Sequence, residues 1–370
     1  DMVVTVTATG YIKRTPLADF RSQRRGGKGV SGGALKDDDV VTTLFVANTH
    51  TPLLVFTTTG MVFKLKTWQL PAGSRSSRGR ALNNVIPGLQ SGTGIAAIMP
   101  VDRDESEWGD LQIVFATSAG TVRRNALSDF TNVMRNGKIA MKLPEDGDVS
   151  LVNARIASEA DDVMLVTALG RAIRFPTVEV RVFKGRDSTG VRGIRLADGD
   201  RVVSMAVIRH FEASPEERQT YLKMRRAMMG VTEEPEADED DGTTEAQEFS
   251  QERYAEMSAA EDLILTVTSQ GMGKLSSSHD YPVRGRGGQG VMAMDKAMRG
   301  GPLVASFPVD MDDQIMLATS RGQSIRVPVD GISFRSRGAG GVRVFKTGEG
   351  EEVVTVAWIA EQAEDDTVEE

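Results

Sequence analysis

The sequence is short of the residues on which many kinds of site depend. It contains no cysteine and only three histidines, and aromatic residues make up 5% of its 370 positions. Without thiols, disulfides and thiolate chemistry are excluded, and the composition fits a reducing cytosol. So few aromatic side chains leave little on which the bases of single-stranded nucleic acid could stack. No apolar run approaches the roughly 18 residues of a membrane span.

The start of the chain, "DMVVTVTATG", lacks the basic end, long apolar core and cleavage site of a signal peptide. Asp1 stands directly before what reads as a strand, without an initiator methionine, so we expect a fragment of a longer chain. Chemistry carried by that longer chain need not be on this one.

Negative charge is concentrated in two segments of the chain. The formal net charge is -8, and residues 210–262 hold 16 acidic and 5 basic residues. The end of the chain, residues 361–370, holds six acids and no base. These segments carry -11 and -6, so the rest of the chain carries +9. A basic body predicts a polyanion as partner.

The sequence repeats with a period near 50 residues. An apolar strand, a glycine turn and a second strand with cations recur six times, and the turn glycines are Gly10, Gly60, Gly120, Gly170, Gly271 and Gly322. Strands rich in Val, Ile, Leu, Phe and Thr around an X-Gly turn predict β-hairpins. Because one such sheet cannot bury its apolar face alone, we predict an all-β fold of six sheets packed around an axis, like a propeller. A linear β-solenoid is the alternative.

The repeats and their interruptions divide the chain. We place the repeats at about 2–50, 51–100, 111–158, 161–209, 262–311 and 312–360, with an acidic helical insertion at 210–261 and an acidic disordered tail at 361–370. In the insertion, Ser214 as N-cap, Pro215 at the first helical position and Gly230 as stop predict one helix. A second helix is predicted in "TTEAQEFSQERYAEMSAAED" from a threonine cap, so the insertion forms a helical arm. The basic, methionine-rich stretch 221–229 suits either a protein partner or simple packing.

Cations recur on glycine-rich loops and beside the turn glycines. The loop set is Arg75, Arg78, Arg80, Arg135, Lys138, Arg186, Arg192, Arg284, Arg286, Arg335 and Arg337. The set beside the turns is Lys13, Arg14, Lys64, Lys66, Arg123, Arg124, Arg171, Arg174, Lys274, Arg321 and Arg326. Taken singly, such cations are typical of outward-facing strand positions. Their recurrence predicts a positive rim that binds phosphates by charge and shape and does not read bases.

The densest loop is "FRSQRRGGKGVSGG", residues 20–33. Its segment "QRRGGKG" resembles the seven-residue box that distinguishes the C-terminal domain of the DNA gyrase A subunit, and "GYIKR" ahead of it is similar to that family too. The resemblance covers about residues 2–360 and implies a six-bladed β-pinwheel whose blades exchange strands, with double-stranded DNA bent around its perimeter. By position, the box residues are Gln23, Arg24, Arg25, Gly26, Gly27, Lys28 and Gly29.

The resemblance also implies what the longer chain does. In that family the box is needed for wrapping DNA, so that an ATP-dependent type IIA topoisomerase introduces negative supercoils. It implies ATP and Mg for the parent enzyme and no cofactor on this chain. The implied partners are the N-terminal catalytic core of the same polypeptide and the gyrase B subunit, in the cytoplasm at the nucleoid. The similar domain of topoisomerase IV has a degraded or absent box, so the intact box favours gyrase, and topoisomerase IV is kept as the alternative. The arm at 210–261 is not explained by the resemblance.

Other classes of function find less support in the residues. His50, His210 and His279 fall in different repeats or at their edges, without the spacing of metal ligands, and "SSSHD" is not triad geometry. No G-x-x-x-x-G-K-[ST] loop occurs, so we expect no catalytic site on this chain. A propeller scaffold that binds an acidic protein is the alternative from another class.

Overall fold

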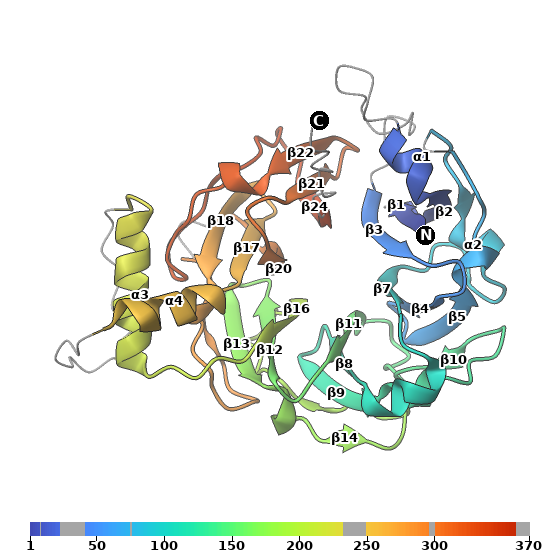
Figure 1. Ribbon diagram of the computed structural model, residues 1–370, viewed down its shortest axis with the longest axis horizontal. Coiled ribbons are helices and arrows are strands. Elements are labelled where there is room, and N and C mark those ends of the chain that lie inside the picture. The colour runs from blue at the N-terminus through green and yellow to red at the C-terminus, as the bar shows by residue number, and fades with distance from the viewer. Residues whose placement is uncertain (8, 23–40, 75, 232–248, 296–299, 360–370) are drawn as a thin grey trace, which may run out of the picture.

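The computed structural model describes the chain except for residues 8, 23–40, 75, 232–248, 296–299 and 360–370, and the side chains of residues 20–22 and 359. The seven box residues, Arg75, the middle of the acidic insertion and the acidic tail therefore lie outside the described residues. Figure 1 shows small sheets arranged around a central axis, so the six-bladed propeller-like fold is confirmed and the linear solenoid is excluded.

Each blade is a small sheet whose strands succeed one another from the axis outward. Blade one consists of β3 (Val41–Ala47), β1 (Met2–Thr7), β2 (Tyr11–Pro16) and β6 (Arg80–Ala81) in that order. Blade two consists of β7 (Ile95–Pro100), β4 (Pro52–Thr57), β5 (Met61–Lys66) and β10 (Lys138–Ile139). Blade three consists of β11 (Leu151–Ala157), β8 (Gln112–Thr117) and β9 (Thr121–Ala126), and both β14 (Val182–Phe183) and β15 (Val191–Arg192) pair with β9. Blade four consists of β16 (Val202–Arg209), β12 (Asp161–Thr167), β13 (Arg171–Pro176) and β19 (Val291–Met292). Blade five consists of β20 (Leu303–Val309), β17 (Leu263–Thr268), β18 (Met272–Ser277) and β23 (Val342–Arg343). Blade six consists of β24 (Val353–Ile359), β21 (Gln314–Thr319) and β22 (Ser324–Pro328).

The outermost strand of each of the first five blades comes from the following repeat. In blade three, for example, Val191 of repeat four pairs with Val122 of β9. Gly190 permits this approach, since its φ is +90° and a Cβ there would lie 2.0 Å from the Val122 carbonyl oxygen. The strand exchange implied by the resemblance is therefore present, and it ties each blade to the next.

Threonine side chains fix the six hairpins. At the end of each first strand a threonine Oγ1 accepts a hydrogen bond from the backbone N–H four residues later. The threonines are Thr7, Thr57, Thr117, Thr167, Thr268 and Thr319. The hydroxyl thus satisfies a backbone donor at the point where the chain reverses.

The core lies between neighbouring blades. Between blades two and three, the rings of Phe56, Phe115 and Phe130 pack edge to face with centroids 5.5–5.8 Å apart. Neighbouring innermost strands are in contact around the whole axis, including β24 of blade six with β3 of blade one. The ring is therefore closed at its centre.

Helices are few and mostly short. They are α1 (Leu17–Ser22), α2 (Leu82–Val85), α3 (Pro215–Met228), α4 (Gln251–Ala259) and the 3-10 helices η2 (Thr67–Gln69), η3 (Glu105–Asp110), η4 (Leu127–Phe130), η5 (Thr177–Glu179), η6 (Ser278–Asp280) and η7 (Val329–Gly331). Ser214 caps α3, as predicted, and Glu217 completes the capping box. The cap predicted for the second helix is wrong: α4 begins after Ser250, whose hydroxyl accepts from the Arg253 N–H. No helix in the described part of the chain is long and apolar enough to cross a membrane.

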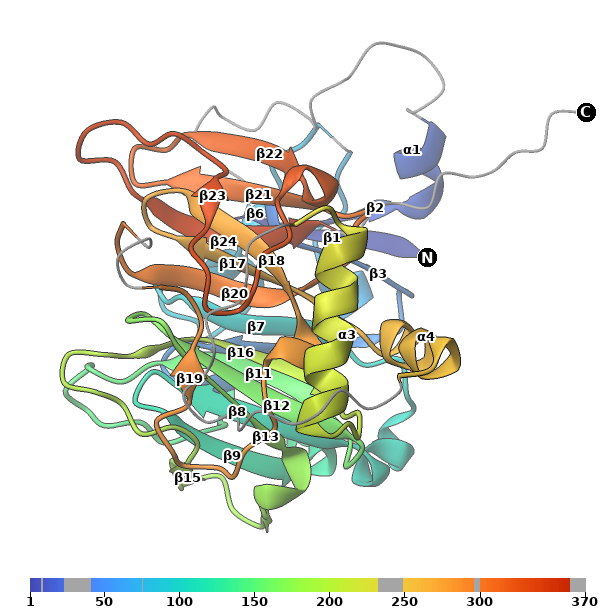
Figure 2. The same cartoon turned by 90° about the vertical axis from the view of Figure 1, so that its left-hand side faces the viewer.

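The helices α3 and α4 form an arm on the outside of the ring, between blades four and five in sequence (Figures 1 and 2). Glu261 fastens the arm to blade five, because its Oε2 accepts from the Tyr221 hydroxyl and from Ser277 Oγ, each at 2.7 Å. His279 of η6 is buried beneath the arm and its Nε2 lies 2.7 Å from the Met257 carbonyl oxygen. The Tyr221 and Phe211 rings pack edge to face on His279, with centroids 5.1 and 5.5 Å from its ring. The arm is thus packed on the blade by polar and aromatic contacts.

We expect the arm to loosen from blade five as the pH falls. Burial lowers the pKa of His279 below its ordinary value of 6.5, so the docked arm favours the neutral ring. Below that ordinary value the undocked state binds more protons, and docking loses stability as the pH decreases. The protection factors of the α3 amides, which are corrected for the intrinsic pH dependence of hydrogen exchange, should therefore be lower at about pH 5.5 than at about pH 7.5. His279→Phe, which cannot be protonated, should remove the difference; equal pH dependence in both proteins would contradict this role.

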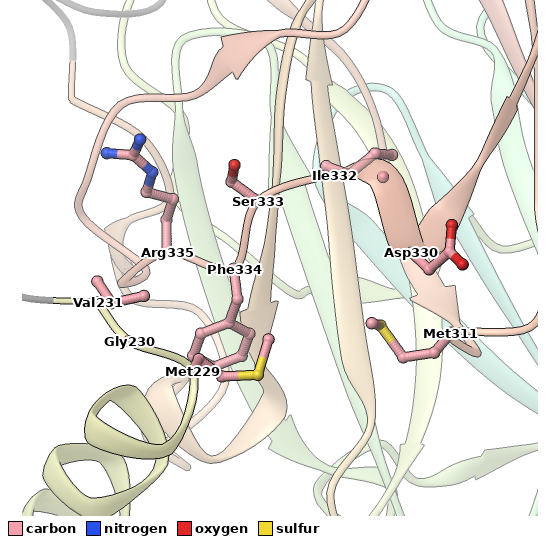
Figure 3. Close-up of a pocket in the computed structure, with 10 residues that line it drawn as sticks. Met229, Gly230, Val231, Met311, Asp330, Ile332, Ser333, Phe334 and Arg335 are labelled. Atoms are coloured by element: carbon pink, nitrogen blue, oxygen red, sulfur yellow. The ribbon is translucent and has the colours of Figure 1, made fainter.

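The C-terminal end of α3 borders an open pocket of about 430 Å³ against repeat six. Figure 3 shows Met229 and Val231 from the arm facing Met311, Ile332 and Phe334. The protein partner considered for residues 221–229 stays a hypothesis, since the arm packs on its own blade.

Candidate nucleic-acid interface

Six of the cations predicted for the rim are buried, which corrects their assignment. They are Lys13, Arg123, Arg124, Arg174, Lys274 and Arg337. Their charged groups donate to carbonyl oxygens of the protein itself. Lys274, for example, is fully buried, and burial lowers its pKa to about 7. These side chains serve the fold and are not available to a polyanion.

Cations three residues after a turn glycine hold the glycine-rich loop of the following repeat. In blade one, Lys13 Nζ donates to the Ser74 and Ser77 carbonyls at 3.0 and 2.6 Å. In blade three, Arg123 Nη1 donates to the Arg186 and Ser188 carbonyls at 2.9 and 2.5 Å. In these blades the loop of the following repeat is therefore shaped by a cation of the blade before it.

Cations four residues after a turn glycine cap the 3-10 helix of the following repeat. Arg14 Nε donates to the Leu70 carbonyl at 2.9 Å, and Lys64 Nζ donates to Thr131 at 2.7 Å. Leu70 and Thr131 are the C-cap residues of η2 and η4. The pairs Arg124 with Val180 and Arg174 with Tyr281 repeat this contact at 2.6 and 3.5 Å. The recurrence in the sequence is thus largely a recurrence of ties between blades.

The remaining predicted cations keep at least part of their surface in solvent. Those exposed are Arg80, Arg135, Arg171, Arg192, Arg284, Arg286, Arg321 and Arg326, and those half-buried are Arg14, Lys64, Lys66, Arg78, Lys138, Arg186 and Arg335. Arg78 stacks on the Tyr11 ring at 3.8 Å, which orders its guanidinium plane. These residues are the predicted rim cations that stay accessible to solvent, and their binding of a polyanion stays a prediction.

The structure brings two glycine-rich loops together beside blades three and four. Gly287 N–H donates to the Gly193 carbonyl and Arg195 N–H to the Gly288 carbonyl, both at 2.8 Å. Arg286 Nη1 also donates to the Arg192 carbonyl at 2.6 Å. Residues 181–195 and 283–290 together hold seven cations and one acid. We call these two loops the blade three–four patch. Within it, cations of repeat four lie beside cations of repeat five.

Sequence reasoning missed several exposed cations. They are Arg181, Lys184, Arg195, Arg343 and Lys346. Three of them lie in the blade three–four patch, and Arg343 lies on the outermost strand of blade five. The sequence could have indicated these residues, because the fold places the residues next to each exchanged outer strand on the outside of the ring.

The chemistry of the patch suits phosphate better than bases. Its exposed apolar side chains are aliphatic, with Val182 at 40% and Val283 at 39% exposure, so the patch offers no aromatic stacking surface for unpaired bases. Guanidinium groups on glycine-containing loops can make paired hydrogen bonds to phosphate oxygens. A surface of this kind would position a duplex without reading its sequence.

The family model described as DNA gyrase C-terminal domain, beta-propeller, matches residues 1–48, 51–85, 112–158, 161–209, 262–306 and 313–357. The chain belongs to this family. The matched segments fall on the six repeats of the gyrase C-terminal domain and leave out the helical arm between 209 and 262.

Curated relatives agree with this assignment. The DNA gyrase A subunit of Granulibacter bethesdensis is 46% identical over 367 residues, which cover 96% of this chain and 39% of the relative. Its counterpart in Escherichia coli is 35% identical and matches 99% of this chain and 35% of its own length. The chain thus spans about two fifths of the curated relatives it matches.

Two solved structures share the fold at 21% identity. The C-terminal domain of DNA topoisomerase IV matches with a TM-score of 0.70 over 97% of this chain and 93% of that chain. The DNA gyrase A C-terminal domain matches with a TM-score of 0.64 over 97% and 99%. Both comparisons support the propeller-like architecture. Topoisomerase IV is the weaker assignment, because the curated relatives are gyrase A subunits by name.

Proposed function

We propose that this domain binds double-stranded DNA on the outer edge of its blades and bends it, as part of a DNA gyrase. The observation that carries the proposal is the blade three–four patch, where seven cations and one acid occupy two adjoining loops on the outside of a ring. A duplex that follows this edge must curve, because the blades that present the cations are arranged around an axis (Figures 1 and 2). Binding is electrostatic and largely independent of base sequence.

The wider role in the proposal belongs to the longer chain. There the wrapped DNA is presented to the catalytic core of the same polypeptide and to the gyrase B subunit, which use ATP and Mg to introduce negative supercoils in the cytoplasm, at the nucleoid. The relatives named as gyrase A subunits support this role. This domain supplies the curved surface and no catalytic group.

Closed circular DNA tests the function directly. The domain is bound to a relaxed plasmid, a relaxing enzyme is added, and the linking number is measured after the protein is removed. We expect the intact domain to change the linking number and the variant Arg24→Ala, Arg25→Ala, Lys28→Ala to bind without changing it. Loss of three phosphate contacts should also lower the salt slope of binding by about 2 to 3. An unchanged linking number with the intact domain would favour the protein scaffold instead, and a variant that still wraps would contradict the role of the box.

A further inference from the structure

The loop over blade five is held from below by one buried ammonium group. Lys274 lies on β18, is fully buried, and donates from Nζ to the carbonyls of Ser336 at 2.9 Å, Ala339 at 2.7 Å and Arg337. An ammonium group has three N–H donors, so each is used by one carbonyl. Three peptide units of one short loop therefore direct their oxygens inward.

Directing the carbonyls inward directs the following N–H groups outward. The described peptide bonds include no cis bond, and in a trans peptide the N–H points opposite to the C=O. The N–H groups that follow the three carbonyls are those of Arg337, Gly338 and Gly340. The first donates to Asp280 Oδ2 at 2.8 Å, which leaves the two glycine N–H groups facing away from the ammonium. A Cβ built on Gly338 would meet no atom within 4 Å, so the space beside it is open.

Two neighbouring N–H donors on an open glycine loop suit an oxyanion. Arg335 and Arg337 belong to the same loop, and Asp280 lies beside it. Burial is the largest effect on the pKa of Lys274 and lowers it, Asp280 raises it, and both arginines lower it, so two cations and one acid act on the loop. Glycine lets a phosphate approach the backbone closely. The loop thus combines two backbone donors, two arginine side chains and open access.

The same arrangement alternates around the ring. Blades one, three and five carry Lys13, Arg123 and Lys274 at the third residue after the turn glycine, and all three hold loop carbonyls. Blades two and four carry Phe63 and Ile173 at this place, and both are buried. The alternate blades therefore show that the fold itself does not require a cation there.

We propose that the loop of residues 335–340 binds a backbone phosphate of duplex DNA through the N–H groups of Gly338 and Gly340, with Lys274 as the positioning residue beneath it. This inference rests on the proposed function, since it specifies how one part of the edge contacts DNA. The ligand is a phosphate group, held by neutral donors as well as by charge. Because neutral donors replace no counterion, this contact adds affinity without adding to the salt slope.

The variants Gly338→Pro and Gly338→Ala separate the N–H from the space around it. Proline removes the donor, whereas alanine keeps it and meets no neighbour at this residue, whose φ is not positive. We expect the proline variant to bind a short duplex about tenfold more weakly, the value of one hydrogen bond to a charged group, with an unchanged salt slope. The alanine variant should bind as the intact domain does. Equal affinity of the two variants, at equal melting temperature, would overturn the proposal.

Amide NMR of the intact domain gives a second measurement that does not depend on folding of a variant. The Gly338 and Gly340 resonances should shift on addition of a short duplex, and Gly331 on the neighbouring 3-10 helix should not. Lys274→Met should abolish the shifts in a folded domain. Saturation with DNA without a shift at Gly338 would refute the site while the proposed function stands, and failure to bind DNA at all would refute the proposed function.

Discussion

Replacing Arg192 and Arg195 with glutamine should weaken DNA binding about 50-fold near 0.1 M salt and lower the salt slope by about 1.8. Both residues are exposed in the blade three–four patch, and the Arg195 N–H is fixed by the Gly288 carbonyl of the adjoining loop. Each arginine that neutralises a phosphate releases counterions, and the slope of log Kobs against log salt counts these events. Titration of a labelled duplex at several salt concentrations measures both quantities.

The matched control replaces Arg103 and Lys223 with glutamine. Both are exposed, one before η3 and one on α3, and neither lies in the patch. The two double variants change the net charge equally. If general attraction between a basic domain and DNA were sufficient, both would weaken binding by the same amount, and the patch would have no special role.

The period of the sequence predicted the architecture because each repeat carries the same local signals for a hairpin. Strand residues of one type flank a glycine that takes positive φ, as at Gly60 with φ +87° and Gly170 with φ +93°. A small sheet with an apolar face must pack on another, so six copies predicted a ring. The Ser214 cap predicted the start of α3 for an equally local reason. Such features depend on neighbours in sequence and can be read from them.

The partner of a cation could not be predicted in the same way. Lys274 and Arg192 both stand beside a glycine in the sequence, yet the first is buried beneath a loop and the second is exposed. An ammonium or guanidinium group donates to a carbonyl oxygen and to a phosphate oxygen with the same hydrogens. The carbonyls that bind Lys274 are more than 60 residues away in sequence, so only the fold decides which oxygen it meets.

Replacing Asp162 with asparagine should destabilise the domain by about 3–5 kcal/mol, the usual cost of leaving a buried charge without its counterion. Asp162 is fully buried, and its carboxylate accepts from Arg174 Nε and from His210 Nδ1, each at 2.8 Å. The Arg174 guanidinium also donates to the carbonyls of Ser278 at 2.8 Å and Arg209 at 3.0 Å. One carboxylate therefore compensates a guanidinium that joins blade four, the start of the arm and η6 of the next repeat.

The control for this variant is Glu159→Gln. Glu159 lies 3.8 Å from Arg124 and its side chain is 68% exposed, so water compensates its loss and the cost should stay below about 1 kcal/mol. Urea unfolding followed by tryptophan fluorescence compares the two variants, and hydrogen exchange shows whether α3 and blade four open together in the Asp162 variant. Loss of protection in both elements is expected, because Arg174 holds η6 and α3 contacts η6 through Arg218 and the His279 carbonyl. If Asp162→Asn unfolds at the same urea concentration as Glu159→Gln, the buried pair is not what holds blade four to η6, and the aromatic packing around His279 must carry that junction.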